Sequence, residues 1–147
     1  MIEAINKAWG WTGVLAKELV AHNEFGNIVF KSTEGEYWRL CPEELSHEKI
    51  TEDDTGWLAL RSDPEFLLDW EMEALVETAK LRLGDLASGE KYCLKFPAVL
   101  GGEYSENNIG KISFLELISC SGDLAAQIQF LEDGDKVRLT TTEIESS

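Results

Sequence analysis

Residues 27–41 read NIVFKSTEGEYWRLC, and this stretch decides the fold. Two runs rich in Val, Ile, Phe, Tyr and Trp, Asn27–Lys31 and Tyr37–Cys41, stand on either side of the polar segment Thr33–Glu36. Side chains of this kind favour extended strands. Gly35 tolerates the positive φ that a tight hairpin turn requires. The stretch therefore predicts an antiparallel β-hairpin.

Further strand signals flank this hairpin and recur near the end of the chain. Glu18–His22 and a short segment around Leu45–Thr51 extend the hairpin to a meander, and Pro42 separates two of its strands because proline has no N–H for the ladder. The segments Lys91–Phe96 and Lys136–Thr142 are expected to join the same sheet.

Helical signals dominate residues 52–84. A short helix is expected near Asp54–Arg61 and a long one over Pro64–Leu83, with Asp63 as its N-cap and Gly84 in the left-handed conformation at its end. One face of the long helix carries the apolar side chains expected in the core, which are Leu68, Met72, Leu75, Ala79 and Leu83.

Two more helices are expected nearer the ends of the chain. Residues 1–9 carry apolar side chains at helical spacing, and Ser113–Glu116 is a capping box that opens a helix reaching to about Leu131. Gly122 lies in the middle of this helix, where glycine costs about 1 kcal/mol relative to alanine. Close packing against a neighbouring element is the expected compensation.

These elements predict an α+β fold. An antiparallel sheet, made of the N-terminal meander and two later strands, is expected to be covered by the helices 64–83 and 114–131. A chain of 147 residues fits one domain, here with residues 1–51 and 52–147 sharing a core. Five Trp and six Phe among 44% hydrophobic residues argue against intrinsic disorder.

The chain is strongly acidic, with 28 Asp and Glu against 13 Lys and Arg and a net charge of -15. Nucleic acid and anionic membranes are therefore excluded as direct partners, because both are bound through Lys and Arg. The sequence has no apolar run long enough to span a membrane and no signal peptide, which predicts a cytoplasmic protein. Cys41, Cys93 and Cys120 are expected to be reduced and mostly buried.

Motifs for catalysis or cofactor binding are missing from the sequence. His22 and His47 have no Cys, Asp or Glu at metal-ligand spacing, and no G-x-S-x-G elbow is present. Gly101 and Gly102 suit a tight bend or close backbone approach better than a phosphate loop, because the acidic Glu103 follows them. The sequence predicts no enzyme, no cofactor and no metal site.

Acidic residues are concentrated in one segment, since residues 52–77 hold nine acids and the single base Arg61. One interpretation is a solvated helical face over core aromatics. The other is a recognition surface for a basic protein partner. The residues expected to contact such a partner are Asp53, Asp54, Trp57, Glu65, Asp69, Glu73, Glu77, Glu103 and Tyr104.

Several segments together carry a resemblance to a known bacterial family; they are residues 8–13, 23–27, 35–45, 69–72, 91–104 and 122–128. Over residues 8–140 the chain resembles the C-terminal domain of type VI secretion DNase immunity proteins, long catalogued as a domain of unknown function. The hairpin containing Phe25–Asn27 and Tyr37–Trp38 is similar to the end of the glutamine-amidotransferase-associated-like region that precedes this domain in longer members, here in abbreviated form.

The resemblance implies a protein that neutralises a toxic effector, a basic nuclease, by binding it. Two other hypotheses remain open at this point. One is a regulatory module that senses a small molecule or peptide in a pocket beside the Gly101–Gly102 loop. The other is an enzyme, which requires a cleft that joins His22 or His47 to a carboxylate or thiol.

Overall fold

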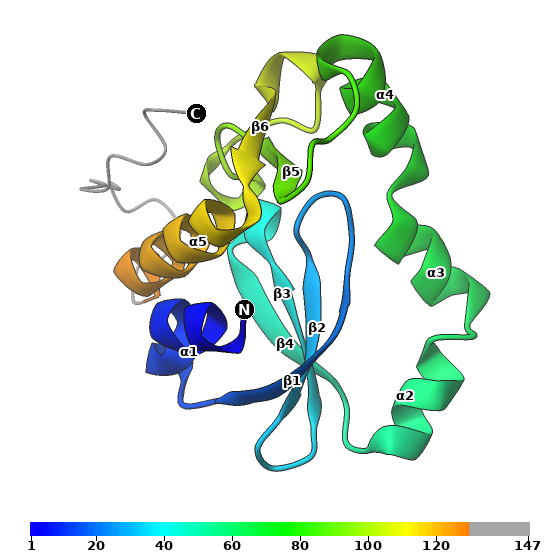
Figure 1. Cartoon of the computed structure of the whole chain (residues 1–147), viewed down its shortest axis with the longest axis vertical. Helices are drawn as coiled ribbons and strands as arrows, with labels where there is room; N and C mark the ends of the chain where they lie inside the picture. Colours follow the sequence, from blue (N-terminus) through cyan, green and yellow to red (C-terminus); the bar gives the residue numbers. More distant parts are fainter. Residues whose placement is uncertain (130–147) are drawn as a thin grey trace.

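A four-stranded antiparallel meander forms the centre of the structure, with its strands in the order β1-β2-β3-β4 (Figure 1). The computed structural model describes residues 1–129. The four strands are β1 (Ala16–His22), β2 (Ile28–Ser32), β3 (Tyr37–Cys41) and β4 (Ser46–Thr51). The meander predicted from the sequence is therefore confirmed, including the hairpin turn, where Gly35 has a φ of +88°.

Two helices cover one face of this sheet (Figure 1). They are α1 (Ile2–Trp9) and α5 (Phe114–Ile128). Their apolar stripes enclose the largest core cluster with inward-facing strand residues, among them Ile5, Trp9, Ile28, Phe30, Leu40, Ile118 and Leu124. Residues from both sides of position 51 contribute to this cluster.

Helices α2 (Asp54–Leu60) and α3 (Pro64–Glu71) cover the other face of the sheet. Strand side chains alternate between the two faces. Val29 therefore points away from α1 and packs with Tyr37 and Trp57, while Phe66 and Trp70 of α3 extend the cluster. The rings of Tyr37 and Trp57 are stacked with their centroids 5.5 Å apart.

The expected strand Lys91–Phe96 exists but does not join the main sheet. It forms β5 (Glu90–Leu94) and pairs with β6 (Ile109–Ser113) as a separate antiparallel ribbon. The prediction of one sheet was wrong in this respect, and β6 was not predicted at all. The sequence IGKIS of β6 is too short and too weakly patterned to stand out without its partner strand.

The single long helix expected over residues 64–83 is also wrong, because Met72 breaks it. Met72 has a φ of +48°, so α3 ends before it and α4 (Glu73–Leu83) begins after it. The break lets α3 pack on the main sheet while α4 packs on the β5–β6 ribbon through Val76 and Ala79. Helices α3 and α4 follow one another along one side of the molecule, with a change of direction between them (Figure 1).

The break changes which apolar side chains are buried. Met72, Leu75, Ala79 and Leu83 pack in or against the ribbon core as expected, but Leu68 on α3 is 75% exposed. The expected strand Lys136–Thr142 and the end of the last helix at Leu131 lie outside the described residues. No helix within residues 1–129 is long and apolar enough to cross a membrane.

The N-cap signals read from the sequence are present. Asp63 caps α3 by accepting a hydrogen bond from the Glu65 N–H, and Ser113 caps α5 by accepting one from the Glu116 N–H. The prediction of a left-handed helical conformation at Gly84 was wrong, because its φ of +80° is combined with an extended ψ of -174°. Gly102 is packed so closely that a Cβ there would lie 1.8 Å from the carbonyl oxygen of Phe96. The expected close approach at this glycine is therefore confirmed.

Close packing at Gly122, the compensation expected for a glycine within a helix, is also present. A Cβ at Gly122 would lie 2.4 Å from the carbonyl oxygen of Ala8 on α1. The Trp11 indole N–H donates to the Gly122 carbonyl at 3.2 Å. The backbone of α5 approaches α1 closely here because Gly122 has no side chain.

We expect Gly122→Ala to destabilise the protein by about 1–3 kcal/mol, because the added methyl group overlaps the α1 backbone. Urea unfolding measures the loss. Gly10→Ala is the matched control: Gly10 has a φ of -61°, and a Cβ there would contact only Leu15, at 3.8 Å. A Gly122→Ala protein as stable as Gly10→Ala would contradict the close contact between α1 and α5.

Candidate functional site

Two adjoining hollows open where the connection between β3 and β4 faces the break between α3 and α4. The first has a volume of about 320 Å³ and is lined by Arg39, Cys41, Glu43, Glu44, Ser46, Glu48, Asp69, Met72 and Tyr104. The second has a volume of about 530 Å³ and is lined by Leu68, Asp69, Met72, Glu73, Ala74, Leu75, Glu77 and Tyr104. Because they share three residues, we treat them as one acidic cleft.

The acidic cleft is rich in negative charge. Among residues 1–129, six carboxylates line it, those of Glu43, Glu44, Glu48, Asp69, Glu73 and Glu77, and Arg39 is the only base. This base is already engaged, since Arg39 Nη1 lies 2.5 Å from Asp69 Oδ2. The cleft therefore offers carboxylates to a cation and repels an anion.

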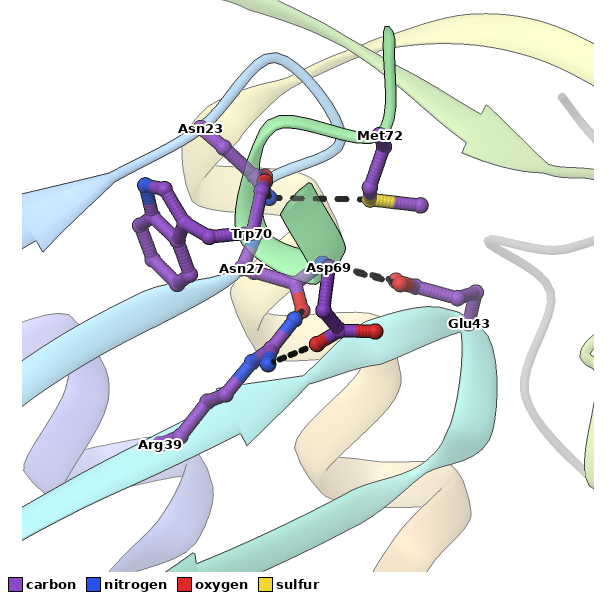
Figure 2. Close-up of polar contacts among 7 residues, drawn as sticks. All are labelled: Asn23, Asn27, Arg39, Glu43, Asp69, Trp70 and Met72. Atoms are coloured by element: carbon purple, nitrogen blue, oxygen red, sulfur yellow. Dashed lines mark hydrogen bonds and ion pairs between the residues drawn. The ribbon is translucent and has the colours of Figure 1, made fainter. Parts of the chain in front are cut away.

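A buried polar network holds the strand side of the acidic cleft (Figure 2). Asn27 donates from Nδ2 to both carboxylate oxygens of Glu43, at 2.9 Å each. The Asn27 Oδ1 accepts from Nε and Nη2 of Arg39, at 3.2 and 2.9 Å. Arg39 then reaches Asp69 on α3, so the network joins β3 and the residue before β2 to the helical side of the cleft.

The turn at Met72 is fixed by a second contact from the strand region (Figure 2). Asn23 donates from Nδ2 to the carbonyl oxygen of Trp70 at 2.8 Å and also lies 3.6 Å from the Met72 sulfur. The last carbonyls of a helix lack partners within it, and Asn23 satisfies one of them. Arg39 adds a cation–π contact, with its guanidinium carbon 5.2 Å from the Trp70 ring centre.

The carboxyl group of Glu43 is held in an unusual environment for an acid. Glu43 is only 5% exposed. Burial raises the pKa of Glu43, and hydrogen bonds from Asn27 and Cys41 oppose that rise. Burial also raises the pKa of the Cys41 thiol well above its ordinary range, with the neighbouring Glu43 adding to the effect. Cys41 is therefore an unreactive thiol at neutral pH.

Tyr104 lines both hollows of the acidic cleft. Its hydroxyl donates a hydrogen bond to Oε1 of Glu44, which ties the loop after Gly102 to the Pro42–Glu44 turn. Burial and this hydrogen bond raise the pKa of Tyr104. The hydroxyl group is thus protonated at neutral pH and acts as a donor.

The structure gathers four of the nine sequence-predicted contact residues at the acidic cleft, namely Asp69, Glu73, Glu77 and Tyr104. The other five do not line it. Asp53 caps α2 through the Gly56 N–H, and Trp57 is 9% exposed within the core. Asp54 forms an ion pair with Lys31 at 2.8 Å and accepts from the Tyr37 hydroxyl at 2.7 Å.

Glu65 and Glu103 are both exposed, away from the cleft lining. Sequence reasoning missed the strand-side carboxylates of the cleft, which are Glu43, Glu44 and Glu48. The acidic pair directly after Pro42 was the available signal, but its position opposite α3 depends on the fold.

In the described part of the chain, the contacts of the two histidines are with a lysine and with aromatic rings. The Lys91 ammonium group lies 2.7 Å from Nδ1 of His22. His47 stacks between Trp38 and Trp9, and its Nε2 has no hydrogen-bond partner among residues 1–129. Within residues 1–129, no group of three or more His, Cys, Asp or Glu side chains is arranged to hold a metal ion.

Comparison with known families adds an observation to this geometry. Residues 53–125 match the family model described as T6SS immunity protein Tdi1, C-terminal. The match supports a place among type VI secretion immunity proteins and runs from the N-cap of α2 to near the end of α5. No curated protein matches the chain.

The matched segment includes the helical side of the acidic cleft and Tyr104, whereas the strand side, residues 39–48, precedes it. The similarity of the N-terminal part to a glutamine-amidotransferase-associated-like region lies before the match and stays a prediction.

The buried carboxyl group of Glu43 predicts a specific pH dependence of stability. Because its pKa is raised above the ordinary value of 4.5, the folded protein binds this proton more tightly than the unfolded chain does. The Glu43 contribution to stability therefore falls as the pH rises from about 4.5 toward the folded-state pKa. Glu43→Gln lacks this contribution. Its free energy of unfolding should therefore increase relative to that of the wild type over the same rise in pH.

Urea unfolding of both proteins at a series of pH values measures this difference. Glu34→Gln, which removes an exposed carboxylate in the β2–β3 turn, is the matched control. A difference between Glu43→Gln and the wild type that stays constant with pH would contradict the raised pKa.

Proposed function

We propose that this chain is an immunity-type protein that binds a toxic effector, a nuclease, and neutralises it through the acidic cleft. The observation that carries the proposal is the gathering of six carboxylates around one hollow surface, part of which lies within the segment matched to immunity proteins. Binding alone accounts for the activity, so no catalytic group is required of the chain.

Electrostatics explains why a nuclease suits this surface. A nuclease holds the phosphate backbone with Lys and Arg, so its substrate-binding face is basic. The acidic cleft presents carboxylates where that face presents cations, and a net charge of -15 speeds the encounter. The bound protein then competes with nucleic acid for the same basic residues. The cytoplasm is the proposed place of action, where an incoming nuclease would reach the genome.

The sensing-module hypothesis gains no comparable support. Gly101 and Gly102 do not line the acidic cleft. A cavity beneath α5, lined in part by Leu117, Ser121 and Leu124, has a volume of about 30 Å³. That is room for about one water molecule, well below the size of a typical ligand pocket.

Charge reversal in the acidic cleft tests the proposal. We expect the double variant Glu73→Lys and Glu77→Lys to bind the effector encoded beside its gene at least about tenfold more weakly, because like charges then face each other. The matched control is Glu3→Lys with Glu34→Lys, which makes the same change in net charge at exposed positions outside the cleft. Binding is measured by calorimetry, and protection by growth of cells that co-express the effector.

The wild-type chain should protect, the control should protect equally, and the cleft variant should not. Failure of the wild-type chain to bind the effector or protect from it would overturn the proposed function. Equal binding by the cleft variant and the control would leave neutralisation in place and remove the acidic cleft as its surface.

A further inference from the structure

An exposed apolar side chain lines the second hollow together with three carboxylates. Leu68 is 75% exposed and lines this hollow with Met72 and Leu75, while Asp69, Glu73 and Glu77 line it from the same two helices. Exposed leucines occur singly on most surfaces, but this one belongs to a hollow that also contains the half-buried side chains of Met72 and Leu75. The hollow thus has an apolar floor and an acidic rim.

The break at Met72 produces this arrangement. In a continuous helix, Leu68 and Met72 would share one buried stripe with Leu75. The positive φ of Met72 instead turns α4 toward the β5–β6 ribbon and leaves Leu68 on α3 without cover. Asn23 and Arg39 hold the turned conformation from the strand side, so the floor is formed before any partner arrives.

We propose that Leu68, Met72 and Leu75 are the anchor site for an apolar side chain of the effector that is flanked by lysines or arginines. The inference rests on the proposed function and assigns dissociation and association to different parts of the hollow. The apolar floor sets how slowly the complex dissociates, because desolvated apolar anchors at the centre of an interface carry most of the binding energy. The rim of Asp69, Glu73 and Glu77 sets how fast the complex forms.

Charge complementarity selects this occupant over the others that an apolar floor admits. A second copy of the chain would place the same acidic rim against itself and be repelled. An acidic segment or an anionic lipid surface would be repelled for the same reason. A basic segment with one apolar residue between its cations satisfies both the floor and the rim.

A peptide experiment tests the anchor directly. The probe is a synthetic peptide with leucines on one helical face and lysines on its flanks, titrated into the full chain by calorimetry. We expect Leu68→Ser to weaken binding by about tenfold or more. Leu81→Ser, which removes a 90% exposed leucine of α4 outside the cleft, is the matched control and should bind like the wild type.

Replacing the peptide's leucines with serines should weaken its binding to the wild type. The wild type and Leu68→Ser should then bind this serine peptide equally. Thermal unfolding checks that both protein variants are folded. Equal binding of the original peptide by Leu68→Ser and Leu81→Ser, or no binding to the wild type, would overturn the anchor.

Kinetics with the effector itself separates this inference from the proposed function. We expect Leu68→Ser to raise the dissociation rate with little change in the association rate, and the Glu73→Lys and Glu77→Lys variant to lower the association rate, most strongly at low salt. An effector complex that forms normally and dissociates no faster from Leu68→Ser would overturn the anchor and leave the proposed function standing. An effector that does not bind the wild type would remove both.

Discussion

The buried amide of Asn27 is the contact on which the rest of this structure depends. Its Nδ2 donates to the carboxyl group of Glu43, its Oδ1 accepts from the guanidinium of Arg39, and the residue has no exposed surface. A buried carboxyl or guanidinium group without such partners would be strongly destabilising. Asn27 satisfies the carboxyl group of Glu43 and the guanidinium group of Arg39 at once. The position of one of these groups therefore fixes the position of the other.

The geometry of the helical side follows from this network. Arg39 extends past Asn27 to the carboxylate of Asp69 and covers the ring of Trp70, which fixes the end of α3 over the sheet. Asn23 then holds the turn at Met72, where the chain changes direction. Two helical segments can therefore pack on two different sheets, which one straight helix could not do.

The acidic cleft lies at this change of direction. Its strand-side carboxylates come from the segment between β3 and β4, and its helix-side carboxylates come from α3 and α4. These acids repel one another, yet most are exposed to water, which screens the repulsion. Under the proposed function, a cationic partner would relieve this repulsion on binding.

Local sequence signals predicted the features that depend on a short stretch of chain or on one residue type. The hairpin around Gly35, the capped starts of α3 and α5, and the close contact at Gly122 each depend on residues near one another in sequence or on one special residue type. Of the four predicted contact residues that line the acidic cleft, Glu73 and Glu77 lie one turn apart on α4, so their shared face follows from the sequence. Asp69 on α3 and Tyr104 join them only through the fold.

The sequence by itself determined the strands of the meander, the positions of most helix ends, the α+β class and the excess of negative charge, since all of these follow from local pattern and composition. Only the tertiary structure decided the break at Met72, the exposure of Leu68, the separate β5–β6 ribbon and the meeting of Glu43, Glu44 and Glu48 with α3. These features depend on contacts such as Asn23 with Trp70 and Arg39 with Asp69, which join residues that no local pattern relates.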